Sequence, residues 1–107
     1  TFHVGAFVNG ELISIASFYN EKNPLFKEES QYRLRGMATL PDHRKRKAGS
    51  SLLLHGEELL KKKNVELWWC NARISVSDYY KKMGLHEYGE VFNINPIGLH
   101  KLMYKNI

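Results

Sequence analysis

Residues 40–53 read LPDHRKRKAGSSLL and give the clearest indication of the fold. An apolar, strand-like segment ends at Pro41, basic residues occupy positions 44–47, and Gly49 with two serines opens an amphipathic run. A helix N-terminus presents unpaired N–H groups and a partial positive charge, and the loop before it can add N–H donors. This order of strand, basic loop and helix start suits a pyrophosphate. The alternative is a solvated basic turn followed by an ordinary surface helix.

Length and composition indicate one globular domain. The chain has 107 residues, of which 43% are hydrophobic and 25% charged, and both shares are typical of globular domains. No apolar run approaches the roughly 20 residues of a membrane span, and we expect no secretory signal. The single cysteine, Cys70, cannot form an intrachain disulfide. We therefore expect a cytoplasmic location.

The charge balance favours an anionic partner. Sixteen basic residues face 11 acidic ones, which gives a net charge of +5 and would suit nucleic acid, a membrane surface or a phosphorylated cofactor. The motifs of nucleic-acid-binding folds are missing from the sequence, and the five histidines lack the close spacing of a metal site. We expect no nucleic-acid partner, no membrane partner and no metal.

Local patterns predict the element order β-β-β-α-β-α-β-β. Asn9-Gly10 is typical of a type I′ hairpin turn, Gly36 indicates a bulge, Asn64 ends the first helix, and Ser77-Asp78 is expected to cap the second. The first helix should present an apolar face made of Leu52, Leu53, Leu54, Gly56, Leu59 and Leu60. The predicted ranges are strands 2–8, 12–19 and 31–40, helix 50–63, strand 65–70, helix 79–83, and strands 87–93 and 100–104.

Three segments stand out in order along the chain. Residues 37–41 are followed by Arg44-x-x-Lys47-x-Gly49, residues 67–73 read LWWCNAR, and residues 79–85 read YYKKMGL. In this order they resemble the GNAT superfamily of acetyl-CoA-dependent N-acetyltransferases. The first is similar to its cofactor motif, Arg/Gln-x-x-Gly-x-Gly/Ala after a strand, the second stands where its central strand lies, and the third resembles its aromatic-rich helix ending in Tyr-x-x-x-Gly-Phe. Together with residues 33–38 and 97–100, these motifs look like a bacterial branch of the superfamily.

The resemblance implies an α/β (α+β) fold with a mixed, mostly antiparallel sheet, lacking the family's usual N-terminal strand and helices. Residues 1–107 would form a single acetyltransferase-like domain, N-terminally incomplete, and the start at Thr1 would mark a fragment or a processed chain. The implied reaction moves an acetyl group from acetyl-CoA to a primary amine of a small molecule or peptide by direct attack. The alternative is a non-catalytic acyl-CoA-binding or degenerate module, because Lys45 and Lys47 stand where the family often has glycine.

The resemblance also assigns residues to roles. Tyr80 would be the general acid that protonates the departing thiolate, with Tyr79 as its competitor. Asn71 or Arg73 would touch the cofactor. The remaining cofactor contacts would come from the third strand, along the pantetheine arm, and from the loop and helix start around the pyrophosphate: Met37, Ala38, Thr39, Arg44, Lys45, Arg46, Lys47, Ala48, Gly49 and Ser50.

Other roles stay open at the level of sequence. Glu29, Glu90 and His100 are all candidates for the general base that deprotonates the amine. Residues 33 and 35 are arginines that either face an acidic acceptor or lie on the solvent side of their strand. Cys70 is expected to be buried rather than nucleophilic. An exposed sheet edge would favour a homodimer.

Overall fold

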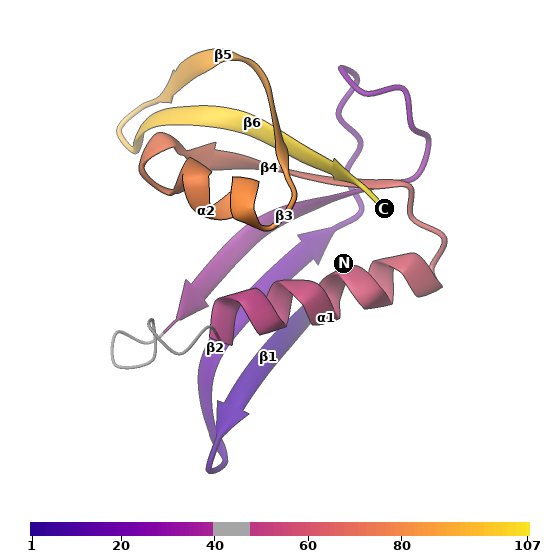
Figure 1. The fold of residues 1–107 in the computed structure, drawn as a ribbon, viewed down its shortest axis with the longest axis vertical. Coiled ribbons are helices and arrows are strands. Elements are labelled where there is room, and N and C mark those ends of the chain that lie inside the picture. Colours follow the sequence, from indigo (N-terminus) through magenta and orange to yellow (C-terminus); the bar gives the residue numbers. More distant parts are fainter. Residues whose placement is uncertain (40–47) are drawn as a thin grey trace.

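The computed structural model describes residues 1–39 and 48–107 (Figure 1). The predicted order of strands and helices is confirmed, with one added 3-10 turn, η2 (Ile74–Val76). The remaining elements are β1 (Phe2–Val8), β2 (Glu11–Tyr19), β3 (Gln31–Thr39), α1 (Ala48–Lys62), β4 (Leu67–Arg73), α2 (Ser77–Lys82), β5 (His86–Ile94) and β6 (Gly98–Asn106).

The strands form one sheet in the order β1-β2-β3-β4-β6-β5. Neighbours are antiparallel except β3 and β4, which run parallel. The predicted mixed, mostly antiparallel sheet is therefore confirmed. Helix α1 crosses the face of β1, β2 and β3, whereas α2 lies beside β4 near the start of β5 (Figure 1). No helix in the described part of the chain is long and apolar enough to cross a membrane.

Two left-handed turns confirm the predicted chain reversals. Asn9 and Gly10 have φ values of 50° and 81°, and both central residues of a type I′ turn need positive φ. Asn64, with φ 61°, ends α1, and the next N–H, that of Val65, donates to the Leu60 carbonyl at 3.1 Å. These short polar residues tolerate a backbone conformation that most residues avoid.

The main core lies between α1 and the sheet. Leu53 and Leu60 of α1 pack with Phe18, Trp68 and Met103, which come from three different strands. Burial of such large apolar side chains is the principal stabilising contribution to a fold of this size. A second cluster, built on Phe26, Leu67, Trp69 and Leu102, covers the opposite face of the sheet.

Three local predictions need correction. Leu54 is 54% exposed, because the buried stripe of α1 runs through residues 52, 53, 56, 57 and 60 and position 54 falls outside it. The strand predicted to begin at Val65 begins at Leu67 and extends to Arg73, since pairing with β6 sets its limits. Ser77 caps no N–H group: its Oγ donates to the Ile74 carbonyl at 3.0 Å, because the preceding turn of η2 already leads into α2.

A bulge in β3 lies beside Gly36, as the glycine indicated. Gly36 pairs with Ser17 and Leu34 pairs with Phe18, so Arg35 is the extra residue of β3. A bulge shifts the alternation of side chains by one position. As a result, Leu34 and Met37 both contact the core on the α1 side although they are three residues apart.

The parallel strands β3 and β4 separate after a short pairing. Residues 31–33 pair with 67–69, and the described residues show no pairing between the two strands beyond that point. From Leu34 onward β3 keeps pairing with β2, and from Cys70 onward β4 keeps pairing with β6. The two strands therefore diverge in the middle of the sheet (Figure 1).

Candidate active site

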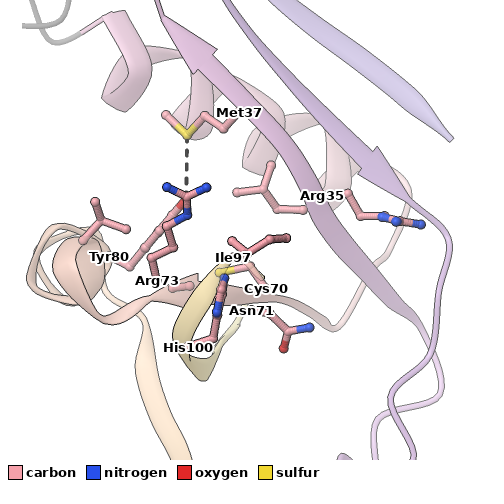
Figure 2. Close-up of a pocket in the computed structure, with 11 residues that line it drawn as sticks. Arg35, Met37, Cys70, Asn71, Arg73, Tyr80, Ile97 and His100 are labelled. Atoms are coloured by element: carbon pink, nitrogen blue, oxygen red, sulfur yellow. Dashed lines mark hydrogen bonds between the residues drawn. The ribbon is translucent and has the colours of Figure 1, made fainter. Parts of the chain in front are cut away.

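A cavity of about 460 Å³ occupies the cleft where β3 and β4 separate (Figure 2). Its wall is formed by the bulged half of β3, the C-terminal half of β4, α2 and the turn before β6. Its lining residues are Leu34, Arg35, Met37, Cys70, Asn71, Ala72, Arg73, Val76, Tyr80, Ile97 and His100.

Tyr80 and Met37 face each other across this cleft (Figure 2). The Tyr80 hydroxyl donates to Met37 Sδ at 3.9 Å, and a thioether is a weak acceptor. Burial, with smaller contributions from Cys70 and Tyr79, raises the pKa of Tyr80 above its usual value. The phenol therefore stays protonated. Its hydroxyl makes only a weak hydrogen bond to sulfur and faces the cavity.

Tyr79 occupies a different environment. Its hydroxyl hydrogen-bonds Ser50 Oγ at 3.1 Å, and it is not among the residues that line the cleft. Because Ser50 lies in the first turn of α1, this bond joins α2 to the helix that follows the basic segment. The geometry thus separates the two tyrosines: Tyr80 faces the cavity and Tyr79 connects helices.

A buried ion pair holds the C-terminal end of α2. Lys105 Nζ lies 2.9 Å from a Glu57 carboxylate oxygen and donates to the Met83 carbonyl at 3.1 Å. Glu57 is only 6% exposed and also accepts from Trp68 Nε1 at 2.9 Å. Through these bonds α1, β4 and β6 together position the short helix that carries Tyr80.

The predicted cofactor residues separate into four groups. Met37, Asn71 and Arg73 line the cleft, so the structure brings both candidates on β4 to it. Ala38 is not among the lining residues, and its carbonyl accepts from Ser14 Oγ at 3.2 Å. Thr39 ends β3, and residues 48–50 begin α1, so these positions flank the basic segment. The predicted contacts Arg44, Lys45, Arg46 and Lys47 lie outside the described residues and stay predictions.

Of the three candidates for the general base, His100 alone lines the cleft. Its ring is 5% exposed, and Nδ1 lies 2.7 Å from the Gly98 carbonyl oxygen. A carbonyl only accepts, so Nδ1 carries the hydrogen and Nε2 of the neutral ring has a free lone pair. In the described part of the chain, Arg33 Nε is the single fully buried side-chain polar atom that lacks a partner. Nε2, for which the structure shows no partner, therefore stays accessible.

The other two candidates lie elsewhere. Glu29 pairs with Lys22 at 2.7 Å, and this hydrogen bond lowers the pKa of the carboxyl. Glu90 lines a separate cavity on the face of the sheet opposite α1. Neither carboxylate reaches the cleft that Tyr80 faces.

Cys70 lines the cleft as an unreactive thiol. Burial raises its pKa to about 12, against a lowering by the nearby Arg33 charge, and a protonated thiol is a poor nucleophile. Arg33 pairs with Glu21 at 2.8 Å and lies over the Trp69 ring at 5.0 Å. Its charge is therefore already engaged. Arg35, the extra residue of the bulge, lies over the Tyr19 ring at 5.4 Å and lines the cleft.

Sequence reasoning gave no site role to Val76 or Ile97. Val76 belongs to η2, and Ile97 belongs to the turn that leads into β6. Ile97 reaches the cleft because β6 pairs along the whole of β4, and Val76 reaches it because η2 directly follows β4. Within the described ranges, no three His, Cys, Asp or Glu side chains gather into a group able to hold a metal ion.

Two comparisons of sequence find relatives of this chain. The sequence model of the Acetyltransferase (GNAT) family matches residues 1–85. The uncharacterized N-acetyltransferase YitI of Bacillus subtilis strain 168 is 52% identical over 107 residues, which are all of this chain and 72% of YitI.

Solved structures share the fold. An aminoglycoside 6′-N-acetyltransferase complexed with coenzyme A has a TM-score of 0.81 at 15% identity, over 97% of this chain and 71% of that one. The PaiA N-acetyltransferase of Thermoplasma acidophilum, in complex with coenzyme A, has a TM-score of 0.72 at 23% identity, over 96% of this chain. The match spans 58% of the PaiA chain.

Proposed function

Because this chain belongs to the GNAT family of acetyltransferases, we propose that it transfers an acetyl group from acetyl-CoA to a primary amine by direct attack. One observation carries the proposal. A protonated tyrosine, Tyr80, and a histidine with a free Nε2, His100, line the same cavity where the sheet opens. One group can give a proton and the other can take one, as amide formation from an amine and a thioester requires.

The cleft fits the extended arm of coenzyme A. Beyond residue 33, β3 has one edge that pairs with β2 and one that faces the opening. A free strand edge offers N–H and C=O groups to an extended chain of amides, which is the chemistry of pantetheine. The proposal places this arm beside Met37 and Thr39, and the pyrophosphate at the basic segment and the start of α1. Two structural relatives are in complex with coenzyme A, which supports coenzyme A as the ligand.

The chemical step then divides between two residues. As the amine nitrogen forms its bond to the acetyl carbon, His100 Nε2 takes a proton from the nitrogen. As the carbon–sulfur bond breaks, the Tyr80 hydroxyl gives its proton to the departing sulfur. The phenol recovers a proton from solvent, and the imidazolium releases one. Each general acid or base of this kind contributes typically about 10²–10⁴-fold to the rate.

The test is amine-dependent release of coenzyme A, followed with a thiol reagent over a panel of primary amines. His100→Gln should lower kcat by about 10²-fold or more, and added imidazole should restore part of the loss. His55→Gln is the matched control, because His55 is an exposed histidine of α1 outside the cleft. Unchanged kcat in the His100 variant would remove this residue from the mechanism.

The same assay separates the non-catalytic alternative. Saturable binding of acetyl-CoA with no coenzyme A release over the whole amine panel would favour an acyl-CoA-binding module. Release that requires both substrates would exclude it.

A further inference from the structure

A second cavity, of about 320 Å³, lies on the face of the sheet opposite α1. Its wall includes Leu25, Tyr88, Phe92 and Leu102, with Asn71 at one end. We call this cavity the β5 groove. Pockets that take small molecules begin at about 300 Å³, so the groove suits one small ligand.

A wide bulge in β5 shapes the groove. Tyr88 pairs with Leu102 and Phe92 pairs with His100, so three residues of β5 stand opposite one residue of β6. Gly89, with φ 75°, begins the bulge. The excess residues bow β5 away from β6, and the aromatic residues at either end of the bulge both contribute to the groove.

The β5 groove adjoins the catalytic cleft. Asn71 lines both cavities, and the Phe92 ring lies 6.1 Å from the ring of His100, centroid to centroid. A further cavity, lined by Lys27, Glu28 and Glu66, shares no residue with the cleft. The shared residue Asn71 and the neighbouring rings of Phe92 and His100 would let an amine held in the β5 groove meet an acetyl group held in the cleft.

The wall of the groove is apolar, with one negative charge. Leu25 is 58% exposed and Tyr88 is 41% exposed, which leaves large apolar surfaces for a ligand to cover. Glu90 is the one carboxylate among the lining residues, and no lysine or arginine accompanies it. A single carboxylate beside an apolar wall favours a monocation with an apolar body over an anion or a polycation.

On the basis of the proposed acetyl transfer, we propose that the acceptor is a small monoamine that carries an aromatic or branched aliphatic group and binds in the β5 groove. Its apolar group covers Leu25, Tyr88 and Phe92, and Glu90 attracts the approaching ammonium. The ammonium releases one proton to solvent, and the neutral amine reaches His100 past Asn71. Removing apolar surface from water is favourable in proportion to its area, so the apolar group supplies most of the discrimination between amines.

The experiment compares 2-phenylethylamine and 3-methylbutylamine with ethanolamine and spermidine at saturating acetyl-CoA. We expect kcat/KM for the two apolar monoamines to exceed that for ethanolamine by about 10-fold or more, within the range that apolar pockets achieve. Leu25→Lys, which places a cation on the apolar rim, should lower kcat/KM for 2-phenylethylamine by about 10-fold and leave Kd for acetyl-CoA unchanged. Leu54→Lys is the matched control, since Leu54 is an equally exposed leucine outside both cavities.

A binding measurement separates this inference from the proposed reaction. Titration with 2-phenylethylamine should shift the ring resonances of Tyr88 and Phe92 in a saturable manner, and Leu25→Lys should abolish the shifts. Failure to bind acetyl-CoA would refute the reaction, whereas the amine titration still tests the groove. Absence of saturable shifts, or kcat/KM for spermidine or ethanolamine equal to that for the apolar amines, would overturn the acceptor class.

Discussion

Replacement of Tyr80 by phenylalanine tests the proposed general acid at small structural cost. The hydroxyl contacts Met37 Sδ at 3.9 Å, and sulfur is a weak acceptor, so its loss should lower the free energy of unfolding by only about 0.5 kcal/mol. The ring, which fills the space beside the core, is retained. Loss of a general acid should lower kcat by about 10²–10⁴-fold. Kd for acetyl-CoA should change little.

The pH profile gives a second readout for the same residue. Burial raises the pKa of Tyr80 above its usual value, so the acid form persists up to at least about pH 10. We expect steady-state kcat of the unsubstituted protein to show no alkaline decline assignable to this phenol below that pH. An alkaline limb between pH 8 and 9 that disappears in Tyr80→Phe would refute the argument from burial.

Tyr79→Phe is the matched control. It removes a hydroxyl from the same short helix, and its bond to Ser50 Oγ at 3.1 Å is lost. This change should lower stability by about 1 kcal/mol and leave kcat within a few-fold. If Tyr80→Phe retains kcat within threefold, or if Tyr79→Phe has the larger effect on kcat, the assignment of the acid is wrong.

Three further predictions concern stability. Gly56→Ala should destabilise the protein by about 1–3 kcal/mol in chemical denaturation, because the added Cβ would lie 2.6 Å from the Phe18 ring, and the loss should shrink when Phe18→Leu is also present. Burial raises the pKa of Cys70 to about 12, so folding favours the protonated thiol, and stability should fall as pH rises above about 9. Above that pH the free energy of unfolding should fall by about 1.4 kcal/mol per pH unit more than it does in Cys70→Ala. Equal pH dependence in the two proteins would refute this. Lys105→Met should lower the free energy of unfolding by about 3 kcal/mol, because it leaves the buried Glu57 carboxylate without its cation. A loss no larger than that caused by Glu57→Gln would contradict the ion-pair argument.

Local chemistry explains which parts of the fold were predictable. Asn9-Gly10 marks the first hairpin because both turn residues need positive φ, and alternation or helical periodicity identifies the strands and helices around it. Leu54 was misplaced because an apolar residue beside the buried stripe resembles a member of it. Such errors shift a boundary or a face without changing the order of elements.

The catalytic cleft depends on pairings between residues distant in the sequence. Tyr80 was identified through its motif, but its opposition to Met37 depends on the bulge at Arg35 and on the early end of the β3–β4 pairing. His100 stood as one of three equal candidates until the register of β6 against β4 placed it opposite Arg73. The β5 groove has no signature in the sequence, since it arises from a bulge opposite a single residue of β6.

The central claim is that the cleft between β3 and β4 receives acetyl-CoA, and calorimetric titration at near-physiological salt tests it most directly. We predict saturable binding at one site with a Kd in the micromolar range. Met37→Trp, which fills the cleft and leaves the sequence of the basic segment unchanged, should weaken this binding strongly. Absence of saturable binding, or binding that Met37→Trp leaves unchanged, would contradict the account.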